Sequence, residues 1–137
     1  MSTTRSLLPL VTSGLLVAVA SCGGKEEPAR EPITLAVQPG DSESVKNAKT
    51  TWSSLCATCH GQTGKGDGPA GQALTPKPRT FADGEWQASV TDEHIRKIIA
   101  EGGPAVGKSA AMPGAPHLKN DPAAIDFLVR VVRSFGG

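Results

Sequence analysis

Cysteine and methionine are scarce in this chain. Cys22, Cys56 and Cys59 are the only cysteines among 137 residues, and Met1 and Met112 are the only methionines. A structural zinc site needs four ligands, so the lack of a second closely spaced cysteine pair argues against one. Basic and acidic residues nearly balance, 14 against 13, so the net charge gives no argument for nucleic-acid binding. Any partner must be recognised through local patches of charge.

Strand-like alternation of convincing length and internal repeats are also missing, so we expect an all-α domain. Three segments carry apolar residues at helical spacing. We expect these helices to start near Ser42, at Thr91 and at Asp121, because Ser, Thr and Asp cap helix N-termini well. The Gly- and Pro-rich stretches between them, 61–80 and 103–118, predict loops.

The beginning of the chain has the organisation of a secretory signal peptide. Arg5 precedes an apolar run at residues 7–20, which is too short to span a membrane as a helix. The run ends in Val-Ala-Ser directly before Cys22. This order resembles the bacterial lipobox, in which the cysteine is acylated and becomes the mature N-terminus. The alternative is an ordinary signal peptide followed by an unmodified Cys22.

The lipoprotein interpretation divides the chain into three parts. We expect a signal peptide at 1–21, a lipidated Cys22 with a flexible tether at 22–41, and a folded domain at 42–137. The protein would then be exported and held by its N-terminal lipid on the periplasmic side of a bacterial membrane.

Residues 56–60, Cys-Ala-Thr-Cys-His, form the most specific motif of the chain. Two thiols three positions apart, followed at once by an imidazole, are the attachment signature of a c-type haem. On a helical turn, Cys56 and Cys59 point to one side and can reach the vinyl groups along one haem edge, while His60 can direct a ring nitrogen at the iron. A thioredoxin-like dithiol would need a βαβ setting, which this sequence does not offer. We therefore predict one covalently bound haem c with its iron.

Met112 is the candidate for the second axial ligand of the iron. It is the only methionine left once Met1 departs with the signal peptide, and it lies in a Pro/Gly loop, where irregular backbone can turn a side chain inward. A Met thioether opposite a His raises the reduction potential and suits electron transfer. The rivals are His94 and His117, although each is more typical of a surface histidine.

Several features together resemble class I (mono-haem) bacterial cytochrome c: the motif at 56–60, the Gly66–Pro69 turn, Met112-Pro113 and the terminal amphipathic helix. The resemblance implies helices wrapped around one haem, with the first and last helices crossing. It also implies that a proline carbonyl accepts a hydrogen bond from the back nitrogen of His60, and Pro69 is the candidate for this role.

The predicted function is that of a one-electron carrier in a respiratory or related chain, with low-spin iron between His60 and Met112. Its partners would be a redox protein donor and a redox protein acceptor, and we predict no catalytic residues. If Met112 does not bind the iron, the open site would instead suit a peroxidase or a sensor of small gases. A further alternative is a tethered cytochrome subunit of a larger respiratory complex.

Overall fold

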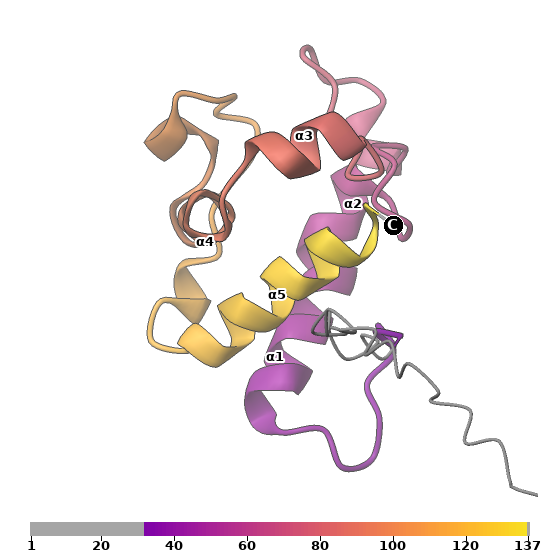
Figure 1. Cartoon of the computed structure of the whole chain (residues 1–137), viewed down its shortest axis with the longest axis vertical. Coiled ribbons are helices and arrows are strands. Elements are labelled where there is room, and N and C mark those ends of the chain that lie inside the picture. The colour runs from indigo at the N-terminus through magenta and orange to yellow at the C-terminus, as the bar shows by residue number, and fades with distance from the viewer. Residues whose placement is uncertain (1–31, 137) are drawn as a thin grey trace, which may run out of the picture. The chain divides into compact units, whose positions relative to one another are not determined.

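The computed structural model of the chain describes residues 32–136 (Figure 1). The expected signal peptide and Cys22 lie outside these residues. The described part is all-α, as predicted, and contains no strand. None of its helices has both the length and the apolar character needed to cross a bilayer. The α-helices are α1 (Glu43–Thr51), α2 (Ala57–His60), α3 (Gly84–Ser89), α4 (Asp92–Glu101) and α5 (Pro122–Ser134), with 3₁₀ turns at Pro69–Gly71, Gly103–Val106 and Pro116–Leu118.

The three predicted helix starts are confirmed. The side chains of Ser42, Thr91 and Asp121 accept hydrogen bonds from backbone N–H groups in the first turns of α1, α4 and α5, at 3.3, 3.2 and 3.1 Å. Each cap satisfies a backbone donor that a helix N-terminus would otherwise leave free. The short helix α3 was not predicted, because six residues are too few for a periodic pattern; Asp83 caps it.

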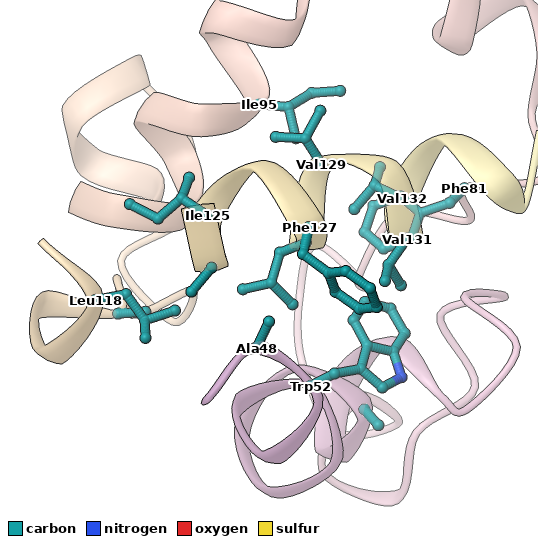
Figure 2. Packing of buried hydrophobic residues seen from close by; sticks show 14 residues of the cluster. Ala48, Trp52, Phe81, Ile95, Leu118, Ile125, Phe127, Val129, Val131 and Val132 are labelled. Atoms are coloured by element: carbon teal, nitrogen blue, oxygen red, sulfur yellow. The ribbon is translucent and has the colours of Figure 1, made fainter. Parts of the chain in front are cut away.

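The crossing of α1 and α5 forms the centre of the hydrophobic core (Figure 2). Ala48 and Trp52 are buried on the first helical segment, and Phe127 and Val131 are buried on α5, as expected for a crossing of the first and last helices. The small Ala48 side chain allows close approach of the two helices. On another side of α5, α4 packs through its buried Ile95.

A π-helical turn, Trp52–Cys56, joins α1 to α2. The Trp52 carbonyl accepts the N–H of Ala57, which lies five residues further along the chain. The helix that starts after Ser42 therefore continues into the Cys-x-x-Cys-His motif, with one local change of winding. Such π turns occur frequently at functional sites, because they change the direction of the side chains that follow.

Residues 33–41, called the N-terminal strap below, pack against the domain, although they fall within the segment predicted to be a tether. Ile33 and Leu35 lie against the hydrophobic core. Lys49 on α1 is only 4% exposed, and its Nζ donates hydrogen bonds to Asp41 Oδ2 at 2.8 Å and to the Ala36 carbonyl at 3.0 Å. A buried ammonium needs such partners. The folded domain therefore begins before Ser42.

The Asp41–Lys49 pair predicts an acid-dependent part of the stability. The hydrogen bond from Lys49 lowers the pKa of Asp41 below its ordinary value of 3.8. A lowered folded-state pKa contributes stability above the unfolded-state pKa, and this contribution is lost as the pH falls through the folded-state pKa. We expect Asp41→Asn to reduce the free energy of unfolding in urea at about pH 7, and to cost progressively less as the pH is lowered toward about 2.

The matched control for this prediction is Glu43→Gln. Glu43 pairs with Lys46 at 2.8 Å, but its side chain is 83% exposed, and exposed pairs contribute little. Glu43→Gln should therefore change the unfolding free energy little at either pH. A cost of Asp41→Asn that did not change with pH would contradict the assignment.

Candidate haem site

A cavity of about 570 Å³ lies among α2, α4, α5 and the loops around residues 74–81 and 108–115. This volume is within the range typical of ligand and cofactor sites. Cys56, Cys59, His60 and Met112 all line it. The rest of the wall is mainly apolar and includes Leu55, Ile95, Ile98, Ile99, Leu128 and Val132. The fold thus brings the predicted haem-binding side chains from two distant segments into one apolar cavity.

The imidazole of His60 is held in one orientation and one tautomer. It is 9% exposed, and its Nδ1 lies 3.3 Å from the backbone carbonyl of Arg79. Because a carbonyl can only accept, Nδ1 donates, and the lone pair of Nε2 remains free to bind a metal. Burial lowers the pKa of His60, which favours the neutral ring that metal ligation requires.

The loop after the motif folds back onto α2 and brings an aromatic ring to His60. The N–H of Gly66 donates to the carbonyl of His60 at 2.8 Å, and the N–H of Phe81 donates to the carbonyl of Gly64 at 2.7 Å. The Phe81 ring stacks on the imidazole, with centroids 4.6 Å apart and an angle of 20° between the planes. Phe81 was not predicted, because a single aromatic residue in a loop carries no periodic signal.

Pro69 is not the acceptor of the His60 hydrogen bond; Arg79 supplies that carbonyl instead. Pro69 begins a 3₁₀ turn and borders a separate hollow of about 330 Å³ beside Thr58. Gly68, the residue before Pro69, explains why Pro69 does not reach the imidazole. Its N–H donates to the carbonyl of Cys59 at 3.1 Å. This bond holds Pro69 against α2, so that only the later part of the loop reaches the ring.

The two thiols are half-buried and line the same cavity. The pKa of Cys56 is raised to about 11, and burial is the largest cause of this shift. The neighbouring Cys59 raises the pKa further. Redox-active cysteines in Cys-x-x-Cys motifs have lowered pKa values, so this environment does not suit a thioredoxin-like dithiol. Among the described residues, no group of three or more His, Cys, Asp or Glu side chains is arranged to hold a metal ion.

The two rival histidines occupy different places. His117 lies outside the lining of the cavity, and its Nε2 is 2.9 Å from the buried hydroxyl of Thr51. His94, expected at the surface, is half-buried and lines the cavity. The sequence could have indicated that His94 lines the cavity, because it lies on α4 one helical turn before Ile98, which also lines it.

Two polar features of the cavity fit an anionic cofactor. Within residues 32–136, its lining includes Lys77, Arg79 and Lys108 but no Asp or Glu. The indole Nε1 of Trp52 is buried without a hydrogen-bond partner among the residues that the structure describes. Buried donors nearly always have partners, and an acceptor on a bound cofactor would supply one here. A haem carries both apolar ring surface and acidic propionates, and this cavity matches it in both respects.

The helical fold and this set of side chains define a cytochrome c. The family described as cytochrome c oxidase, cbb3-type, subunit III matches residues 43–133. The cbb3-type cytochrome c oxidase subunit FixP of Azorhizobium caulinodans is 30% identical over 100 residues, which are 72% of this chain and 30% of that protein. No solved structure matches the chain.

The chain therefore belongs to the cbb3-type cytochrome c oxidase subunit III family. Its cofactor is covalently bound haem c, and its function is electron transfer. The chain spans about a third of the length of its relative, so membership of an oxidase does not follow from the match alone.

Phe81 provides a test of how the imidazole is supported. Replacing Phe81 with Ala should lower the free energy of unfolding by about 3–5 kcal/mol, the usual cost of removing a buried aromatic ring. It should also alter the optical spectrum of the haem, because the ring that stacks on His60 is lost. Val37→Ala is the control, since Val37 is 50% exposed and should have almost no effect. An unchanged spectrum in Phe81→Ala would show that His60 does not need this ring.

Proposed function

We propose that this domain is a one-electron carrier in which Cys56 and Cys59 attach the haem and His60 and Met112 are the axial ligands of its iron. The observation that carries this proposal is that all four side chains line one cavity, although Met112 is separated from the motif by a long stretch of chain. When bound, the haem supplies a one-electron couple between ferric and ferrous iron. A thioether opposite an imidazole favours the reduced state and suits this task.

The residues around the four ligands have separate roles in the proposal. The Arg79 carbonyl and the Phe81 ring keep Nε2 of His60 directed into the cavity. The aliphatic wall from α4 and α5 excludes water, which makes the iron environment apolar and keeps reorganisation small. Lys77 and Lys108 offset the charge of the acidic groups of the haem and can meet an acidic redox partner.

The same domain can serve as a tethered cytochrome subunit of a larger respiratory complex. Both the matching family and the Azorhizobium caulinodans relative carry the name of a cbb3-type oxidase subunit, which favours this setting. The electron donor and acceptor would then be neighbouring redox centres of that complex. A peroxidase or gas-sensor function has no supporting observation, and it requires that Met112 does not bind the iron.

The ligand assignment is tested by carbon monoxide, which binds ferrous haem only where the sixth position is open. We expect the unmodified ferrous protein to keep its low-spin optical spectrum under carbon monoxide, because Met112 fills that position. Met112→Ala should bind carbon monoxide and lose the near-infrared sulfur-to-iron charge-transfer band of the ferric form.

His94→Ala is the matched control for this test, because His94 also lines the cavity. It should behave as the unmodified protein does. Ready binding of carbon monoxide by the unmodified protein, or a change in ligation only in His94→Ala, would overturn the assignment of Met112.

The proposed localisation is the periplasmic side of a bacterial membrane, with acylation of Cys22 as the anchor. Two or more acyl chains are needed for stable anchoring, and a lipidated N-terminal cysteine would provide them. We expect Cys22→Ser to move the haem protein from the membrane fraction to the soluble fraction. Ser21→Ala, which keeps a small residue before the cysteine, should remain in the membrane fraction. A Cys22→Ser protein that still sedimented with membranes would exclude the lipid as the anchor.

A further inference from the structure

The backbone of the Met112 loop is bound directly to the C-terminal end of α4. The N–H of Gly103 donates to the carbonyl of Met112 at 3.0 Å. Three residues further on, the N–H of Ala115 donates to the carbonyl of Ile99 at 2.8 Å. The last carbonyls of a helix have no partner within the helix, and the loop supplies one of them here. The chain is therefore held on both sides of the Met112 side chain.

These contacts require glycine at two positions where the loop and the helix end meet. Gly102 has a φ of +85°, and a Cβ there would lie 2.7 Å from the nitrogen of Gly114 and 2.9 Å from the carbonyl oxygen of Met112. A Cβ on Gly114 would lie 2.6 Å from the carbonyl oxygen of Ala100. All these neighbours are backbone atoms, which cannot swing away as a flexible side chain can. A side chain at either position would push the Met112 loop off α4.

We propose that Gly102 and Gly114, together with the N–H of Gly103, form a glycine clasp that positions Met112 as the axial ligand of the haem iron. The clasp acts through Met112 and does not touch the iron. Two hydrogen bonds fix the backbone around Met112, and the missing side chains allow the loop to approach α4 closely. This inference rests on the proposed ligation by Met112 and names the residues that make such ligation stable.

The test compares Gly114→Ala and Gly102→Ala with Gly107→Ala in the haem-loaded protein. Gly107 lies in the same loop region and has a φ of +70°, but no atom lies within 4 Å of a Cβ placed on it. Gly107→Ala thus imposes backbone strain without a collision. We expect Gly114→Ala and Gly102→Ala to lose the sulfur-to-iron charge-transfer band of the ferric form, to have a lower reduction potential, and to bind carbon monoxide at least about tenfold more tightly. Gly107→Ala should retain the band, the potential and the resistance to carbon monoxide.

Hydrogen exchange of the unmodified protein tests the clasp without any variant. The amides of Gly103 and Ala115 should exchange at least about tenfold more slowly than in an unfolded chain, because both are bonded across the clasp. Exchange of both amides at the unprotected rate would overturn the proposal, even if the glycine variants failed to fold.

The experiments distinguish a wrong ligand assignment from a wrong assignment of the clasp. Loss of the band in Met112→Ala together with a normal band and potential in a folded Gly114→Ala would overturn the clasp and leave the ligand in place. An unchanged band in Met112→Ala would overturn the ligand assignment, and with it the purpose given to the clasp. A loss of the band in Gly107→Ala equal to that in Gly102→Ala would show that backbone strain, and not the close approach, is responsible at Gly102.

Discussion

A small helical domain that must enclose an apolar cavity of about 570 Å³ has less protein core than its length suggests. Small domains bury a limited fraction of their surface, and their stability is correspondingly marginal. In this chain, Leu55 before α2 and Ile98 and Ile99 of α4 border the cavity and are only partly buried, so that their packing is completed by what fills it. The haem is therefore both the redox group and a large part of the core, and its covalent attachment keeps that part in place.

The two axial ligand candidates are positioned in the same way. In each case a loop returns to the end of a helix and donates hydrogen bonds to the carbonyl groups there. At the end of α2, the carbonyls of Cys59 and His60 accept N–H groups from the glycine-rich loop that leads to Arg79 and Phe81. At the end of α4, the carbonyl of Ile99 accepts the N–H of Ala115 from the Met112 loop. Helix C-termini have free carbonyls, and glycine-rich loops can approach them closely. The glycines of these two loops therefore help to fix the backbone near both axial ligand candidates.

Much of the fold followed from local sequence signals. Ser42, Thr91 and Asp121 predicted helix starts because capping depends on a single side chain and the next turn of backbone. The crossing of α1 and α5 followed from the resemblance to class I cytochrome c. The packing of the N-terminal strap onto the domain was not predictable, because it depends on Lys49, whose charge gives no sign of burial in the sequence.

The candidate site was predictable where it depended on residue type and was not predictable where it depended on the path of a loop. Spacing and elimination predict Cys56, Cys59, His60 and Met112 as site residues, and all four line the cavity. Pro69 was chosen for its residue type, but the hydrogen bond of Gly68 to Cys59 holds it away from the imidazole. Arg79 contributes its backbone carbonyl, a group that every residue has, so no sequence pattern could have singled it out. His94 faces the cavity because of the rotation of α4, which its apolar stripe predicts only approximately.

In the proposed ligation, one iron lies between an imidazole nitrogen from α2 and a thioether sulfur from the loop after α4. X-ray absorption at the iron edge of the ferric, haem-loaded protein measures this directly, because sulfur and nitrogen neighbours scatter differently. We expect a single sulfur neighbour, from Met112, beside the nitrogens of the haem ring and of His60. A coordination shell made only of nitrogen and oxygen atoms would contradict it.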